Sequence, residues 1–265
     1  MPELPEVEDA RRRAERALAG RRILEVATVP DPIVYEGVSP RRFAAALRHR
    51  RVERVGRKGK HLWLELDRRP WPLFHFGMTG SLQIYRDESE RPRFWKVELL
   101  AEGGGRVAMP DARRFGRIRL RHDPATEAPL RDLGFDPLIA LPAAEVLLRE
   151  LARRTAPIKA VLLDQGLFAG VGNWIADEVL FQAGIRPHRP AHRLTPAEVS
   201  RLRARLRGIV RRAVAVDADS DRFPRGWLFH RRWGRDADAR TGRGDKIVHA
   251  TIGGRTTAWV PARQR

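Results

Sequence analysis

The chain has 265 residues, a length that fits one large or two modest domains, and two are expected. Its 52 Lys and Arg residues exceed its 33 Asp and Glu residues, and the formal net charge of +19 favours a polyanionic partner, nucleic acid first. The lack of cysteine excludes disulfides and thiolate metal sites, and no apolar run approaches the ~18 residues of a membrane span.

The first half of the chain predicts one helix followed by strands. Residues 8–19 have the spacing of an amphipathic helix that Gly20 ends. Because residues 10–22 are rich in arginine, no signal peptide is expected, and the protein is predicted to be cytoplasmic, or nucleoid-associated if bacterial. Alternating runs predict strands at 23–26, 51–55, 61–66, 73–76, 81–85, 94–100, 106–109 and 118–120, with a short helix at 40–49.

The second half predicts helices and then a hairpin. Helical periodicity covers 142–154, 157–165, 173–183 and 196–216, and the last of these begins with a capping box from Thr195 to Glu198. Two short runs flank Gly253-Gly254, as in a β-hairpin. The prediction is an α+β protein. A helix and a two-layer antiparallel β-sandwich form residues 1–136, helices form 137–226 and a hairpin forms 227–265.

The first residues combine a candidate nucleophile with candidate acids. If Met1 is removed, Pro2 presents a secondary amine, and an α-amino group, with a pKa near ~8 against about 10.4 for lysine, is more often neutral at pH 7. Attack of this amine on a sugar C1′ would give an iminium ion. Glu3 and Glu6 would lie within one helical turn of it. Alternatively, these prolines and glutamates only form a helix start.

Two glycine-containing turns in the first half carry basic or apolar side chains. Lys60 follows Gly59 in a turn that leads into a strand, where a lysine can neutralise a phosphate or transfer a proton, although a solvated basic hairpin is equally compatible. Met78 lies among glycines in the stretch 75–82, which favours exposure over the usual core role of methionine. The basic loop at 109–117 contains one aromatic residue, Phe115, and is compatible with an ordinary surface turn.

A third glycine-rich segment joins two predicted helices. Three glycines lie between residues 166 and 172, and Asn173 caps the helix that follows. Backbone amides at such a helix start bind anions, and with Lys159 opposite, a phosphate is the natural ligand. The alternative is a plain helix-helix turn in which the glycines serve only packing.

Together these stretches resemble the formamidopyrimidine-DNA glycosylase and endonuclease VIII family. The resemblance begins with Met-Pro-Glu-Leu-Pro-Glu-Val-Glu at residues 1–8 and continues through the motifs around Lys60, Met78 and Phe115. The stretch 158–185 is similar to the family's helix-two-turn-helix, and 251–265 is similar to its zinc-finger hairpin. All six stretches occur in the expected order, which is more specific than any single match.

The resemblance implies a bifunctional DNA glycosylase and AP lyase that acts on oxidised bases in duplex DNA. Pro2 would form the Schiff base, Glu3 would donate a proton and Glu6 would support the amine, while Lys60 and Arg255 would assist β- and δ-elimination. It also implies residues that contact DNA. Met78 would fill the place of the extruded base, Arg113 would meet the orphaned opposite base and Phe115 would intercalate, and the phosphate and groove contacts would come from His75, Lys159 and Asn173.

Two departures from the family pattern bear on the hairpin and on the substrate. Val260 and Arg263 occupy the places of the last two zinc cysteines, so the hairpin is expected to pack around Trp259 and Ile252, as in the zincless plant and fungal members. The segment 216–227 is brief where bacterial members carry a longer one that closes over 8-oxoguanine. Formamidopyrimidines, further-oxidised guanines and abasic sites are therefore the expected lesions, in a monomer without cofactor or metal. A non-catalytic nucleic-acid-binding protein remains the alternative.

Overall fold

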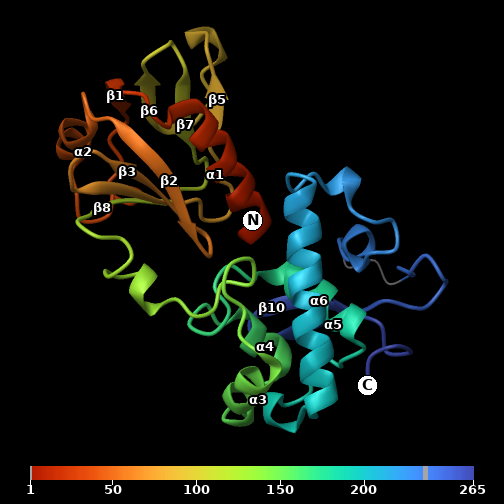
Figure 1. Ribbon diagram of the computed structural model, residues 1–265. Coiled ribbons are helices and arrows are strands. Elements are labelled where there is room, and N and C mark those ends of the chain that lie inside the picture. Colours follow the sequence, from red (N-terminus) through yellow and green to blue (C-terminus); the bar gives the residue numbers. More distant parts are fainter. Residues whose placement is uncertain (1, 235–237) are drawn as a thin grey trace. The chain divides into compact units, whose positions relative to one another are not determined.

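The computed structural model describes residues 2–234 and 238–265, which form two compact units (Figure 1). The first unit ends at Asp132 and the second begins at Leu133. Within the described residues no helix is both long and apolar enough to cross a membrane. The division after residue 136 and again after 226, expected from the sequence, stays a prediction.

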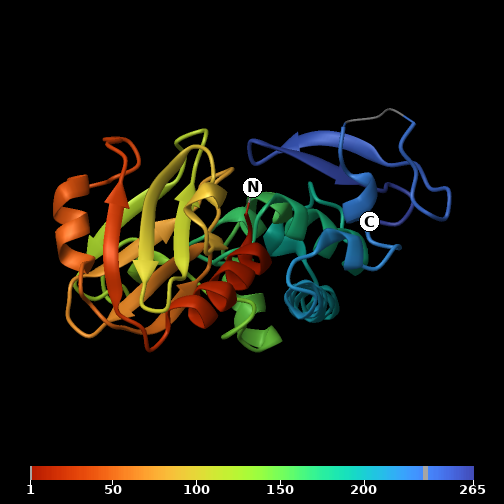
Figure 2. The ribbon, with the colours of Figure 1, turned by 90° about the horizontal axis from the view of Figure 1, so that it is seen from above.

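The first unit contains two four-stranded antiparallel sheets. Figure 2 shows strands of the first sheet side by side, with the helix α2 (Pro40–Leu47) at one end. That sheet has the order β1 (Ile23–Thr28), β6 (Trp95–Ala101), β7 (Arg106–Pro110) and β5 (Gln83–Tyr85). The second has the order β2 (Val52–Lys58), β3 (His61–Leu66), β4 (Trp71–His75) and β8 (Arg117–Arg121).

Period-two alternation directs the core side chains of both sheets into one cluster. In β3, Leu62, Leu64 and Leu66 are buried while the residues between them are partly exposed. Val26, Val97, Leu99 and Val107 of the first sheet share a core with Val55, Leu62, Leu64 and Phe74 of the second. The two-layer antiparallel sandwich predicted from these alternating runs is confirmed.

Helix α1 (Leu4–Leu18) covers part of this core with one stripe of small and apolar residues. Val7, Ala10, Ala14 and Leu18 recur every three or four positions and are buried, while the arginines between them lie on the other face. The helix starts earlier than predicted from the sequence, at Leu4, because proline is tolerated in a first turn, where its missing N–H costs no helical hydrogen bond.

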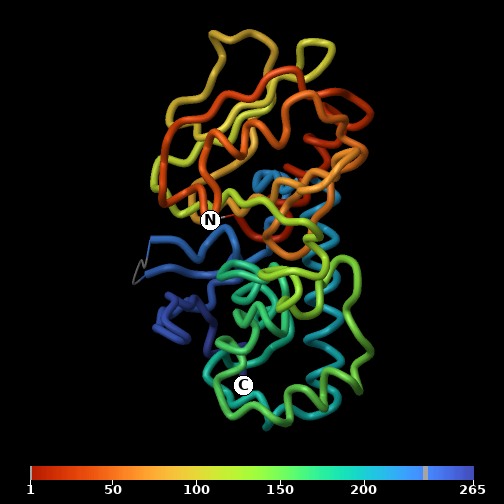
Figure 3. Tube along the Cα trace, turned by 90° about the vertical axis from the view of Figure 1, so that its left-hand side faces the viewer, coloured from red at the N-terminus to blue at the C-terminus, as the bar shows by residue number. Residues whose placement is uncertain are grey.

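The described residues of the second unit form four α-helices and one hairpin, traced in Figure 3 from green to blue. Helix α6 begins at the predicted capping box, where the Glu198 N–H donates to the Thr195 hydroxyl at 3.3 Å. Helix α5 ends at Gly184, whose φ of 69° is the left-handed conformation that glycine adopts most easily. The elements are α3 (Ala144–Ala152), α4 (Ile158–Leu163), α5 (Asn173–Ala183), α6 (Pro196–Ala215), β9 (Val248–Ile252) and β10 (Arg255–Trp259).

Ile252 and Trp259, around which the β9–β10 hairpin was expected to pack, are both buried. The hairpin also contributes to a small apolar cluster of other side chains. Its members are Leu228, Ile247, Ala258 and Val260, with Phe181 and Ala239 against them. These residues come from five separate stretches of the chain, so local periodicity could not identify them.

Glu178 ties the segment after α6 to helix α5 from a buried position. Its carboxylate accepts the Phe229 N–H at 2.9 Å and the Gln182 side-chain amide at 2.7 Å. Burial raises the pKa of Glu178 to about 7, helped by the neighbouring Asp177 charge and opposed by these hydrogen bonds. The acid is therefore partly neutral near physiological pH.

Replacing Glu178 with Gln is expected to remove a pH dependence of stability. The pKa of Glu178 in the folded state, about 7, exceeds the ordinary value of 4.5. The stabilisation by the neutral acid is therefore complete below pH 4.5 and is lost as the pH rises through 7. The loss amounts to at most about 3 kcal/mol. Urea unfolding at pH ~5 and pH ~8 measures the difference. The wild type should lose stability relative to Glu178→Gln at the higher pH, whereas the exposed control Glu145→Gln should follow the wild type. Parallel behaviour of wild type and Glu178→Gln would contradict this.

Candidate functional site

The N-terminal end of α1 holds a buried carboxylate beside Pro2. Glu3 is only 1% exposed and is the N-cap of the helix. Its backbone N–H donates to the Glu6 carboxylate at 3.0 Å, so Glu6 fixes the direction in which the chain enters the helix. Pro2 itself is half-buried. The expected removal of Met1 concerns a residue outside the described part of the chain.

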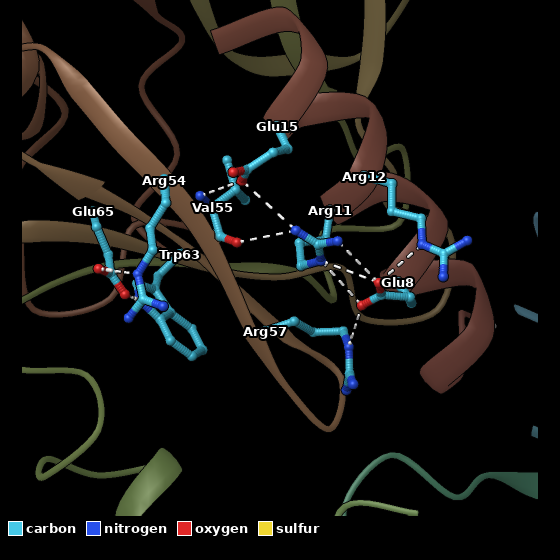
Figure 4. A network of polar contacts seen from close by, with 9 residues as sticks. All are labelled: Glu8, Arg11, Arg12, Glu15, Arg54, Val55, Arg57, Trp63 and Glu65. Carbon is cyan, nitrogen blue, oxygen red and sulfur yellow. Dashed lines mark hydrogen bonds and ion pairs between the residues drawn. The ribbon is translucent and has the colours of Figure 1, made fainter. Parts of the chain in front are cut away.

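A buried arginine links α1 to the turn that carries Lys60 (Figure 4). The Arg57 side chain is 1% exposed and donates to the Glu8 carboxylate at 3.0 Å and to the Gly59 carbonyl at 3.0 Å. Burial alone would raise the pKa of Glu8, but hydrogen bonds from Arg11 and Arg57 outweigh it and hold the pKa below its usual value. The second turn of the helix and the β2–β3 turn are thus fastened to the same guanidinium.

Lys60 and two histidines gather at one end of the second sheet. His61 and His75 are paired across β3 and β4, with ring centroids 4.8 Å apart. Burial, and then the charges of Lys60 and Arg119, lower the pKa of His75 to about 4, while burial and the neighbouring His75 lower that of His61 to about 3. Both rings are therefore neutral at pH 7. The Gly77 N–H lies 3.3 Å from His75 Nδ1, which assigns the ring proton to Nε2 and makes it a neutral donor.

The turn with Met78 and the loop with Phe115 are packed against each other. Gly77 has a φ of 62°, and a Cβ placed on it would lie 2.3 Å from the Phe115 carbonyl carbon, so only glycine allows this approach. The Thr79 hydroxyl donates to the Asp111 carboxylate at 3.3 Å and adds a polar link between the two segments. Met78 and Phe115, which are far apart in sequence, are therefore carried by one rigid pair of loops.

Two buried aspartates brace the loop at 109–117. Asp111 is fully buried and accepts the backbone N–H groups of Arg114 at 3.1 Å and Gly116 at 2.7 Å. Asp31 receives the Arg114 guanidinium at 3.0 Å and the Lys96 ammonium at 2.9 Å. Burial opposes its ionisation, but these contacts hold the pKa of Asp31 well below its usual range. They also hold Arg114 at a φ of 58°, which few non-glycine residues adopt.

The braced loop presents an aromatic ring and a guanidinium to solvent. Phe115 is 46% exposed, a large fraction for a phenylalanine, and the Arg113 guanidinium lies 4.9 Å from its ring centroid. Met78 on the neighbouring turn is half-buried. Such an apolar edge and a planar cation on a fixed support suit insertion between stacked bases.

In the second unit, Lys159 has a different environment from the one expected. The sequence suggested an ammonium open to a phosphate, but Lys159 is 0% exposed, pairs with Asp177 and donates to the Asn173 carbonyl at 2.9 Å. Asp177 also receives Arg232 at 2.7 Å and the Ala258 N–H at 3.2 Å. Asp177 lies one turn into α5 and so faces the lysine, which places this cation inside the protein.

Asn173 and Arg255 lie at the same end of the second unit. The Asn173 side-chain amide donates to the Thr256 carbonyl at 2.8 Å, while its Oδ1 is buried without a hydrogen-bond partner among the described residues. Arg255 begins β10, next to Thr256 in sequence, and is exposed. The Thr256 carbonyl thus connects the start of helix α5 to the strand that carries the exposed Arg255 guanidinium.

Three supporting residues escaped sequence reasoning, namely Arg57, Asp111 and Asp177. Each is a charged residue that the fold buries, and nothing in the local sequence of Arg57 or Asp177 distinguishes them from exposed charges. Asp111 alone had a usable signal, since an aspartate followed by a basic loop and a glycine is typical of a capped turn. Within the described residues, no group of three or more His, Asp or Glu is arranged to hold a metal ion.

Asp111→Asn is expected to loosen the paired loops. One carboxylate oxygen that accepts an N–H would become an amide that cannot, which should lower the free energy of unfolding by about 1–3 kcal/mol. Urea unfolding and amide hydrogen exchange at Arg114 and Gly116 measure the effect. Asp67→Asn, at an exposed position, is the control and should change neither. Unchanged exchange at both amides in Asp111→Asn would refute the bracing role.

Family models and curated relatives of this chain all point to one family. Residues 1–118 match the model of the formamidopyrimidine-DNA glycosylase N-terminal domain, and residues 133–224 match that of its H2TH domain. Formamidopyrimidine-DNA glycosylase from Arabidopsis thaliana is 39% identical over 278 residues, covering 100% of this chain and 71% of the relative. The enzyme of that name from Desulfitobacterium hafniense is 34% identical over 274 residues, covering 100% of both.

Solved structures agree with these relatives in fold. Lactococcus lactis formamidopyrimidine-DNA glycosylase bound non-covalently to DNA with an AP site has a TM-score of 0.86 at 23% identity, covering 99% of each chain. The same enzyme with DNA containing N7-benzyl-Fapy-dG has a TM-score of 0.87 at 25% identity, covering 100% of each chain. The resemblance stated from the motifs is confirmed, and the chain belongs to the formamidopyrimidine-DNA glycosylase family.

Proposed function

We propose that the protein is a DNA glycosylase and AP lyase that removes oxidised bases from duplex DNA through a Schiff base on Pro2. The observation that carries the proposal is the buried Glu3 carboxylate at the start of α1, directly after the half-buried Pro2. A buried acid next to a potential amine has the two groups that glycosidic cleavage requires. Family membership and the formal charge of +19 support the same partner and reaction.

The reaction follows from these two groups. The Pro2 nitrogen lone pair forms a bond to C1′ as the glycosidic bond breaks, the base leaves with the electrons of that bond and a proton, and the attached amine loses its own proton. When the C1′–O4′ bond then breaks, O4′ takes a proton and C1′ becomes an iminium ion; Glu3 donates the proton to the base or to this ring oxygen. Loss of a C2′ proton sends its electrons toward the iminium ion. The 3′ phosphate then leaves in β-elimination, and the 5′ phosphate in δ-elimination. Lys60 and Arg255 assist these proton transfers, and Glu6 holds the chain in position for attack.

The other predicted residues grip the DNA. Met78 and Phe115 fill the space of the extruded nucleotide, and Arg113 meets the opposite base. His75 offers its neutral Nε2–H to a phosphate, which fits its lowered pKa. Asn173 contacts a phosphate from the start of α5, and Lys159, buried beneath it, keeps that helix start in place for the contact.

The substrates proposed are formamidopyrimidines, further-oxidised guanines and abasic sites in duplex DNA. The support is the brief segment 216–227 that follows α6, where bacterial members of the family carry a longer one that closes over 8-oxoguanine. The protein would act as a monomer with three functional segments, residues 1–136, 137–226 and 227–265. The hairpin would work without zinc, since the buried Asp177 already ties it to α5.

Borohydride trapping tests the Schiff base. The protein with Pro2 at its terminus should give a covalent adduct with a duplex that contains an abasic site, because reduction fixes the iminium ion. A version in which two extra residues stay attached before Pro2 should give none, since an amide nitrogen is not nucleophilic. The same two residues added after Arg265 are the control and should leave trapping intact. Equal adduct formation by the blocked protein would remove this assignment. Absence of an adduct from all three proteins would also remove it and would favour the non-catalytic alternative.

Glu3→Gln is expected to separate the two activities. Loss of the acid should slow release of a formamidopyrimidine by about 10²–10⁴-fold. Cleavage at a preformed abasic site should fall much less, because no base needs to be protonated there. Single-turnover assays on both duplexes measure this, with the exposed Glu25→Gln as control. Equal losses on both substrates would argue that Glu3 only shapes the helix start.

A further inference from the structure

A cavity of about 450 Å³ lies in the first unit, and none of the residues proposed to act on DNA lines it. It is at the C-terminal half of α1, which runs beside β5 and β7 (Figure 1). Arg16 follows Pro2 by 14 positions, and at ~1.5 Å per residue the helix separates them by roughly 20 Å. The lining residues are Arg13, Arg16, Ala17, Arg21, Ile84, Tyr85, Arg86 and Gly105.

Positive charge in this cavity is poorly compensated. Arg13 lies 3.7 Å from Asp9, and Arg21 donates to the Ala17 carbonyl at 2.8 Å. Within the described residues, neither Arg16 nor Arg86 forms an ion pair. Four guanidinium groups against one carboxylate leave three positive charges around one hollow.

The acidic residues that follow Arg86 already have other partners. Asp87 accepts the Ser89 N–H at 2.8 Å, Glu90 accepts the Asp87 N–H at 3.2 Å, and Glu88 pairs with Arg91 at 2.8 Å. Glu88 also pairs with Arg106 of β7 at 3.4 Å, so each of these carboxylates already has a partner. An external anion is therefore the natural way to neutralise the cavity.

The remaining walls are apolar. The side chains of Ala17 and Ile84 contribute to them, and the Tyr85 hydroxyl is hydrogen-bonded to the buried Glu98. The volume is within the range of about 300–1,000 Å³ that small-ligand pockets occupy. Guanidinium groups bind phosphate oxygens in pairs, and several of them around one hollow match a chain of linked phosphates better than a single charge.

We propose that this cavity binds a small ligand with at least two linked phosphates and three or more negative charges. Inorganic polyphosphate and nucleoside polyphosphates share this chemistry. The inference does not rest on the proposed function, because the cavity uses none of its residues. A nucleoside would add contacts to Ile84 and Tyr85, so comparison of inorganic triphosphate with ATP distinguishes the two sources.

Calorimetric titration of the whole protein with inorganic triphosphate, and then with ATP, tests the proposal. One saturable site is expected, and the double variant Arg16→Gln/Arg86→Gln should weaken it by at least about tenfold. The control Arg207→Gln/Arg211→Gln removes the same charge from exposed positions on α6 and should bind like the wild type. No saturation up to about 1 mM, or equal losses in both double variants, would overturn the proposal.

Gly105→Asp provides a second variant that does not depend on removing charge. A Cβ on Gly105 would lie 3.6 Å from the Arg21 guanidinium in ordinary contact, so the new carboxylate would occupy the cavity from within. This variant should melt at a higher temperature than the wild type and lose the thermal shift that triphosphate produces. A higher melting temperature with undiminished triphosphate binding would refute the site.

Undamaged duplex DNA is the competing occupant. If the cavity contacts a DNA backbone instead, Arg16→Gln/Arg86→Gln should lose duplex affinity more than Arg207→Gln/Arg211→Gln does, and a short duplex should displace triphosphate. Either result would overturn the small-ligand proposal. Unchanged duplex affinity in Arg16→Gln/Arg86→Gln, together with loss of triphosphate binding, would support it.

Discussion

The first unit depends on the buried contact of Arg57 with Glu8 and with the Gly59 carbonyl. Burying a guanidinium away from water costs free energy unless its N–H groups find acceptors. This contact therefore tolerates little displacement of either partner. One partner is on α1, two turns from the N-terminus, and the other immediately precedes Lys60. The contact thereby fixes the position of the helix start relative to the β2–β3 turn. Chemistry that needs the terminal amine and a lysine to act on one sugar requires such a link.

In the second unit, the buried Asp177 carboxylate links separate segments as Arg57 does in the first. It gathers Lys159, Arg232 and the Ala258 N–H, and so joins α4, α5, the segment after α6 and the hairpin at a single buried carboxylate. A zinc ion held by cysteines would tie a hairpin by metal bonds, whereas here charge-assisted hydrogen bonds have that role. The arrangement explains how a hairpin without cysteine can keep Arg255 at a fixed place next to Asn173.

Local patterns predicted most of the secondary structure because each element has one buried face. The alternation of Leu62, Leu64 and Leu66 gave the bounds of β3 as found, and periodicity with a glycine stop gave those of α5. The same reasoning began α1 too late, and it did not predict the burial of Lys159 beside Asp177. Those errors have one cause, since helix capping and burial of charge depend on partners that only the folded chain brings together. Candidate residues were named from the resemblance, whereas their supports, such as Arg57, needed coordinates.

In the proposed reaction the N-terminal proline, and no lysine, forms the bond to the sugar. Peptide mapping by mass spectrometry of the borohydride-reduced adduct distinguishes the two, because it identifies the nitrogen that carries the deoxyribose remnant. The added mass is expected on the N-terminal peptide, at the Pro2 nitrogen. Added mass on a peptide that contains Lys60, or any other lysine, with an unmodified N-terminal peptide would contradict it.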